Sequence, residues 1–112
     1  MGLTVKDCTV GAVTAGTTQT LAGATAITTD ITVVTTGNAS DGVVLPVGAP
    51  GQLLYLKNGA NAGKIYAPNL GTIDGTAGAT GVALTASKTT LLACTALAAG
   101  GVSTWVTLMV SA

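Results

Sequence analysis

Residues 58–66, NGANAGKIY, have the outline of a ligand-binding motif, because a glycine and a short spacer precede Gly63-Lys64. A phosphate-binding loop has the form G-x-x-x-x-G-K-[ST], in which backbone N–H groups wrap the phosphates and the hydroxyl reaches a magnesium ion. Here three residues separate Gly59 from Gly63, and Ile65 stands where the hydroxyl is required. The run that follows is extended and ends in proline, so it does not start a helix. The stretch therefore predicts no nucleotide site.

Asn58-Gly59 instead favours a tight turn, because both residues tolerate positive φ and apolar runs flank them on both sides. We interpret the segment as a hairpin between two strands, with Lys57 and Lys64 at its shoulders. Lysines at such positions keep an exposed hairpin soluble. We expect the hairpin tip to contact a neighbouring subunit rather than a nucleotide.

General acid–base chemistry has few candidate residues in this chain. It contains no His, Glu or Arg, so the available groups are four aspartates and four lysines. Asp41-Gly42 and Asp74-Gly75 are turn dipeptides, and Asp30 lies in a β-branched run at a sheet edge or solvent face. No pair of carboxylates is spaced for catalysis, and metal ligands are too sparse for a site. We predict that the protein is not an enzyme and that it uses no cofactor or metal.

The two cysteines, Cys8 and Cys94, are far apart and follow no metal or redox spacing. We predict that they are small apolar residues, buried or half-buried. A disulfide between them would require the first strand to neighbour a late one, and it would not be expected in a protein made in the cytosol.

Charge is scarce throughout the 112-residue chain, which is long enough for one domain. Only 7% of the residues are charged and the net charge is zero, so no basic footprint for nucleic acid is present. Mean hydropathy is +0.66, yet Thr and Gly interrupt every apolar run before it is long enough to span a membrane. The first residues lack a secretory signal pattern, so we expect a soluble protein made without export. A surface this poor in charge suggests that partners cover much of it.

The abundance of Thr, Ala, Gly and Val predicts an all-β fold. Short β-branched and apolar runs alternate with glycine-rich turns, which indicates about seven or eight short strands in an antiparallel β-sandwich. The pattern is weakest over residues 1–25, which we interpret as an N-terminal arm or edge strands. Residues 26–112 are expected to form the β-sandwich domain.

Two of the predicted strands are apolar on both faces. Leu53 and Tyr55 share one face of residues 52–57, and Leu54 and Leu56 share the other. In residues 103–110 we expect Trp105 and Met109 on one face. Val106, Leu108 and Val110 are then expected on the opposite face. Either one face packs in the core and the other against another subunit, or a central strand is covered on both sides within one domain. Six residues are candidates for an interface: Tyr55, Lys57, Lys64, Tyr66, Trp105 and Met109.

A pattern made of several short motifs extends from about residue 40 to residue 106. It consists of V-x-L-P before a G-x-x-x-x-L-x-N strand, then I-Y-x-P, I-x-G and a late Thr-Trp. These positions are Val43, Leu45, Pro46, Gly51, Leu56, Asn58, Ile65, Tyr66, Pro68, Ile73, Gly75, Thr104 and Trp105. The pattern resembles the small jelly-roll-like domains of tailed-phage head decoration (cement) proteins. It consists of turns and core positions, and it carries no catalytic residues to transfer.

The resemblance implies a structural virion protein of a bacteriophage that forms a homotrimer on the capsid surface. Its partners would be other copies of the chain and the major capsid protein, with neither nucleic acid nor membrane as a partner. It would be made in the host cytoplasm and stabilise the head by bridging capsid subunits. One alternative is a glycan-binding head domain of a tail fibre or adhesin, in which Tyr55, Tyr66 and Trp105 are stacking platforms. A second alternative is another structural virion subunit, such as a major capsid or tail-tube protein.

Overall fold

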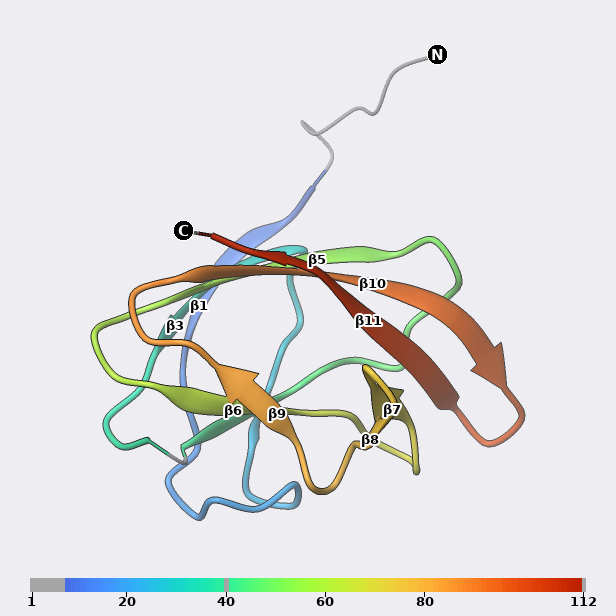
Figure 1. The fold of residues 1–112 in the computed structure, drawn as a ribbon, viewed down its shortest axis with the longest axis horizontal. Coiled ribbons are helices and arrows are strands. Elements are labelled where there is room, and N and C mark those ends of the chain that lie inside the picture. Colours follow the sequence, from blue (N-terminus) through green and yellow to red (C-terminus); the bar gives the residue numbers. More distant parts are fainter. Residues whose placement is uncertain (1–7, 40, 112) are drawn as a thin grey trace.

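The computed structural model describes residues 8–39 and 41–111, which form an all-β protein (Figure 1). A seven-stranded sheet has the strand order β1-β3-β5-β10-β11-β7-β8, and a four-stranded sheet has the order β2-β4-β6-β9. The strands are β1 (Val10–Thr14), β2 (Thr25–Ala26), β3 (Ile31–Thr35), β4 (Gly42–Val44), β5 (Leu53–Asn58), β6 (Gly63–Tyr66), β7 (Thr72–Ile73), β8 (Thr76–Ala77), β9 (Val82–Leu84), β10 (Thr89–Ala98) and β11 (Val102–Val110). The described residues contain no helix that is long and apolar enough to cross a membrane.

Strand number and pairing differ from the sequence prediction. The described residues form eleven strands instead of seven or eight, and five of their pairings are parallel: β1–β3, β3–β5, β2–β4, β4–β6 and β11–β7. The prediction of an antiparallel fold is therefore wrong, because the sheets are mixed. The two sheets face each other as layers, which is compatible with a β-sandwich (Figure 1).

The first six strands alternate between the two sheets. β1, β3 and β5 pair in parallel in one sheet, while β2, β4 and β6 pair in parallel in the other. The chain therefore winds around the core in three successive turns, as in a short β-solenoid. β9 then pairs antiparallel with β6, and β10 pairs antiparallel with β5 and β11.

Tight hairpins occur where consecutive residues adopt positive φ. Asp74 and Gly75 have φ of 52° and 78° and join β7 to β8, so the turn predicted for this dipeptide is confirmed. Gly100 and Gly101, at 81° and 76°, close the turn between β10 and β11. Glycine accepts this conformation without steric cost, and aspartate tolerates it better than most residues.

The hairpin predicted at Asn58-Gly59 is wrong, because β5 and β6 belong to different sheets. The segment carries the chain from one layer to the other. Neither Asn58 nor Gly59 has positive φ, and Gly59 instead donates its N–H to the carbonyl of Val34. Asn58 is buried, and its amide braces the crossing by donating to the carbonyls of Asn61, Leu84 and Thr85.

The core lies between the two layers and is built from inward side chains of both. The seven-stranded sheet contributes Val34, Leu54, Leu56, Leu92, Cys94 and Trp105, and the four-stranded sheet contributes Val43, Ile65 and Leu84. Trp105 has no exposed surface. A Cβ at Gly48 would lie 2.5 Å from its Cζ2 atom, so the backbone at Gly48 packs directly on the indole ring.

Candidate interaction surface

The outward face of the seven-stranded sheet carries several exposed apolar side chains, among them Val10, Val33, Leu53 and Tyr55. Along β5, Leu53, Tyr55 and Lys57 are exposed while Leu54 and Leu56 are buried. This alternation confirms the face assignment predicted for the strand. Because nothing in residues 8–39 or 41–111 is stacked on the outward side of β5, Leu53 remains 40% and Tyr55 44% exposed.

Pairing registers extend this surface across five neighbouring strands. Val10 of β1 pairs with Ile31, Ile31 with Tyr55, Tyr55 with Leu91, and Leu91 with Met109 of β11. These five side chains form a cross-strand row on the same side of the sheet, since paired residues in a ladder point the same way. We define the outer face as this row together with Val33, Leu53 and Lys57.

Met109 belongs to the outer face because of a bulge in β11. Leu91 pairs with Met109 and Leu92 pairs with Thr107, so Leu108 has no partner on β10. An extra residue in one strand reverses the alternation of faces beyond it. Trp105 therefore points into the core while Met109 is 56% exposed, and the prediction that they share a face is wrong.

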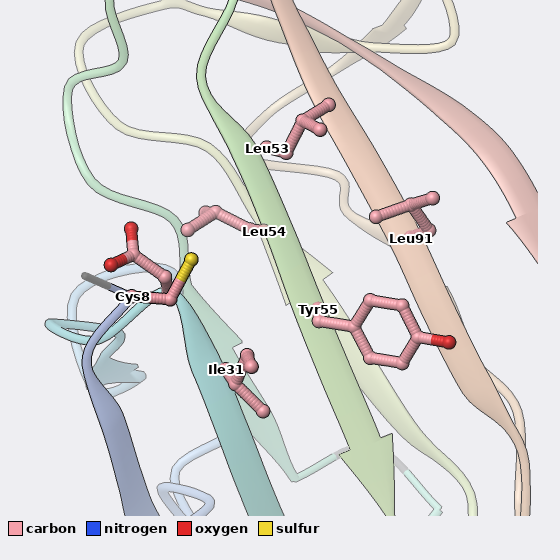
Figure 2. Close-up of a pocket in the computed structure, with 7 residues that line it drawn as sticks. Cys8, Ile31, Leu53, Leu54, Tyr55 and Leu91 are labelled. Carbon is pink, nitrogen blue, oxygen red and sulfur yellow. The ribbon is translucent and has the colours of Figure 1, made fainter. Parts of the chain in front are cut away.

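A hollow of about 300 Å³ opens on the outer face at the amino-terminal ends of β3 and β5. Figure 2 shows the Tyr55 ring extending from β5 toward β10, with Leu91 of β10 above the ring and Ile31 of β3 on the other side of β5. The lining is almost entirely apolar and comes from Cys8, Asp30, Ile31, Leu53, Leu54, Tyr55 and Leu91. Such a lining can bury apolar groups but offers little chemistry for a reaction.

The charged residues near β5 are separated along the strands, while Asp74 lies farther away in the turn between β7 and β8. Asp30 precedes β3 and lies at the rim of the hollow, whereas Lys57 lies near the other end of β5. Lys88 is next to Thr89, the residue that pairs with Lys57. The outer face is therefore apolar in the middle, acidic at one end and basic at the other.

The pKa of Asp30 is lowered from its ordinary value of 3.8, chiefly because the backbone N–H of Thr9 donates to the carboxylate. The Thr9 hydroxyl donates to the same oxygen, at 3.0 Å, and strengthens the effect. These contacts attach the residue before β1 to the residue before β3.

Acid is expected to loosen this attachment. A depressed carboxylate pKa contributes stability that is complete above 3.8 and is lost as the pH falls through the folded-state pKa. We therefore expect the amide of Thr9 to exchange faster below pH 3.8, in a hydrogen-exchange series followed by NMR. In Asp30→Asn the exchange rate, once corrected for intrinsic chemistry, should not show this step. A Thr9 amide with the same pH profile in both proteins would contradict the assignment.

Three of the six predicted interface residues meet on the outer face, namely Tyr55, Lys57 and Met109. Lys64 is half-buried on β6 in the other sheet, where its Nζ donates to the carbonyl of Thr80. Tyr66 and Trp105 are buried, at 2% and 0% exposure.

Sequence reasoning missed Ile31, Leu91 and Val33 as part of the same surface. The alternation of Ile31 and Val33 with Thr32 and Val34 carried a signal for one outward face. Only the strand pairing shows that this face adjoins that of β5.

Both described cysteines are free, with Cys8 half-buried and Cys94 buried, as predicted. Within the described ranges, no three His, Cys, Asp or Glu side chains gather in a way that would hold a metal ion. The chain matches no protein-family model, no curated protein and no solved structure with which it was compared.

Proposed function

We propose that the protein is a phage capsid decoration protein, which self-associates and binds the outer surface of the capsid. The outer face carries this proposal, because it combines exposed Val10, Leu53, Tyr55 and Met109 with a scarcity of charge. Contiguous apolar surface of this kind marks an interaction site in a protein that is otherwise folded around its own core.

The proposed mechanism is mechanical. Each copy would bury apolar surface against another copy or against the major capsid protein, at about 25 cal/mol per Å² of apolar area before the costs of association. Bridging of neighbouring capsid subunits then resists outward pressure, because separating the subunits would expose this surface again. Many weak contacts repeated over a capsid sum to a large resistance.

Further details of the proposal rest on the resemblance of residues 40–106 to jelly-roll-like decoration domains. These are the trimeric state, the location on the virion and the contact with the major capsid protein. The mixed sheets lack the all-antiparallel pairing of a jelly roll, so the relation is proposed at the level of a two-layer β-fold. The N-terminal arm falls partly on residues 1–7, which lie outside the described residues, and the division after residue 25 stays a prediction.

Glycan binding by a fibre head domain is the second candidate, and one observation favours it. Tyr55 is 44% exposed beside an apolar hollow, as a stacking platform for a sugar ring would be. The other two proposed platforms, Tyr66 and Trp105, are buried and lie on different sheets. The decoration function requires only the apolar surface that is present, so it is supported better.

Replacing Tyr55 with aspartate is expected to abolish association with capsids while leaving the fold intact. The side chain is exposed, so the change costs little in the core, but it places a charge in the centre of the outer face. We expect at least about a tenfold loss in binding to expanded capsids, measured by co-sedimentation, since a desolvated unpaired charge costs more than about 1.4 kcal/mol.

Ala83→Asp is the matched control, because Ala83 is exposed on the four-stranded sheet. It should bind capsids like the original protein. Equal binding by both variants would exclude any contribution of the outer face to capsid binding, either as a direct contact or through self-association. A copy number in native particles far below that of the major capsid protein would exclude decoration itself and favour a fibre protein.

A further inference from the structure

We infer that the outer face is an isologous interface with a second copy of this chain. In this interface a two-fold axis lies across the strands, so that the Asp30 end of one copy meets the Lys57 end of the other. This geometry rests on the self-association proposed above and specifies which surface associates, and in which orientation.

The size of the outer face suits a second copy. Five adjacent strands, from β1 to β11, contribute to it. At about 4.8 Å per strand and 3.3 Å per residue, five strands of about six residues cover roughly 480 Å² of flat area. Two such faces bury about 1,000 Å² in total, which is near the lower limit for a specific protein interface. Side chains that project from the sheet make the true contact area larger than this flat estimate.

Charge decides the orientation. The outer face and its ends carry Asp30 at the amino-terminal end of β3, with Lys57 and Lys88 at the opposite end of the sheet. If the strands of the two copies ran in the same direction, the lysines would face lysines and the aspartates would face each other. A two-fold axis perpendicular to the strands reverses one copy, and each acidic end then meets a basic end.

The strand registers place Asp30 of one copy and Lys57 of the other at the same position along the strand direction. Ile31 pairs with Tyr55, so Asp30 lies level with Leu54, three residues before Lys57 on the neighbouring strand. With the axis between the levels of Tyr55 and Leu56, Asp30 of one copy falls level with Lys57 of the other. The two lie one strand apart, about 4.8 Å laterally. Thr9 of the same copy holds the Asp30 carboxylate at the rim of the hollow, so the lysine side chain covers most of the separation of about 10 Å between packed sheets.

The same axis brings the Tyr55 rings of the two copies close together at the centre of the contact. Leu91 and Met109, which continue the row of Tyr55, then pack around them. Aromatic residues at the centre of an interface with charges toward its rim follow the usual anatomy of protein contacts. An isologous contact of this kind closes with two copies, so the free protein is a dimer rather than the trimer that the resemblance implies.

A charge exchange tests this orientation in the full-length protein. Asp30→Lys and Lys57→Asp each create like-charge contacts, and the two-fold axis makes every contact occur twice. We expect each single variant to raise the dimer dissociation constant by roughly tenfold, measured by sedimentation equilibrium in low salt. The double variant exchanges the two charges and should return the constant to within about threefold of the original.

Control variants distinguish an effect of charge on the dimer from an effect on folding. Lys64→Asp makes the same charge change on the four-stranded sheet and should leave the dimer unchanged. Asp30→Asn keeps a side-chain oxygen for the N–H of Thr9, which Asp30 accepts at 2.9 Å. It should weaken the dimer a few-fold and reduce the dependence of dimerisation on salt, because it removes the charge alone. Circular dichroism of each variant reports whether the β-fold is retained.

Several results would overturn the inference. These are a monomer or trimer mass for the original protein, a double variant as weak as the singles, or a dimer insensitive to both charges. If such a protein still binds capsids, the decoration function stands without this interface. A dimer that passes the charge exchange but does not bind capsids would support the interface and contradict the decoration function.

Discussion

Trp105→Ala is expected to lower the free energy of unfolding by about 3–5 kcal/mol, the usual loss when a large aromatic residue is removed from a core. The indole ring is fully buried and lies under the backbone at Gly48, whose added Cβ would be 2.5 Å from the ring. Because main chain at Gly48 covers part of the ring, we expect the space to collapse poorly there and leave a cavity. Urea denaturation followed by circular dichroism measures the change.

Two further variants distinguish cavity formation from other causes. In Trp105→Phe the loss should be smaller, since the indole Nε1 has no hydrogen-bond partner among residues 8–39 and 41–111 and only volume is removed. Leu70→Ala removes an apolar side chain that is 89% exposed, and it should change stability by no more than about 0.5 kcal/mol. An Ala variant at position 105 that unfolds at the same urea concentration as the original protein would contradict the central position of this residue.

Asn58→Ala is expected to cost about 3 kcal/mol or more, because several buried polar groups lose a partner and each costs about 1–3 kcal/mol. Asn58 is 4% exposed, and its Nδ2 lies 2.7 Å from the carbonyl of Asn61. Its Oδ1 accepts from the N–H of Gly59 at 2.9 Å and from the hydroxyl of Thr36 at 3.2 Å. Thermal and urea denaturation should agree on the loss.

Asn58→Asp tests the same hydrogen-bond network by changing a donor group while keeping the size of the side chain. It keeps the shape but replaces a donor with a carboxylate oxygen facing the carbonyls of Leu84 and Thr85, and it should destabilise at least as much as alanine. Asn38→Ala alters an exposed asparagine in a turn and should be nearly neutral. If both changes at position 58 proved as mild as this control, the amide would not be bracing the crossing between the sheets.

Local features of the fold were predictable from the sequence because they depend on neighbouring residues alone. The alternation in residues 53–56 indicated which side chains point inward, and burial confirms it. Asp74-Gly75 indicated a tight turn, and both residues adopt the positive φ that such a turn requires. The abundance of Thr, Ala, Gly and Val predicted an all-β protein without reference to any partner strand.

The winding of the first six strands was not predicted, because parallel pairing leaves no turn signature between partners. A signal was nevertheless present, since Val-Thr-x-Gly occurs at residues 13–16 and again at residues 34–37. These segments stack in register, with Val13 beside Val34 and Thr14 beside Thr35. In the third turn of the winding, Asn58 at the end of β5 pairs with Val34 and so takes the position of that valine. Its side-chain amide donates to the carbonyl of Asn61 in the crossing to β6. A search for repeats would have favoured a winding fold over a hairpin.

The candidate surface was predicted only in part, because the alignment of neighbouring strands decides which face some side chains are on. Tyr55 and Lys57 follow from the alternation of one strand, whereas Met109 reaches the outer face only through the bulge at Leu108. Regular alternation placed Met109 with Trp105, and an unpaired residue between them reverses that assignment. Burial of Tyr66 likewise depends on neighbouring strands, since its ring lies against Gly42 and Gly81, where an added Cβ would lie no more than 3.0 Å from ring atoms.

The strand order has a consequence for synthesis on the ribosome. β10 and β11 are the last strands in the chain, yet they lie inside the seven-stranded sheet, between β5 and β7. While these strands are still unmade, β5 has an open edge, and the early turns of the winding have only part of their core. Leu91 and Met109 complete the row that begins at Val10, so the outer face does not exist as a continuous surface on a nascent chain. For the association proposed above, this order of synthesis means that an unfinished chain lacks the complete outer face until almost all of the sequence has been made.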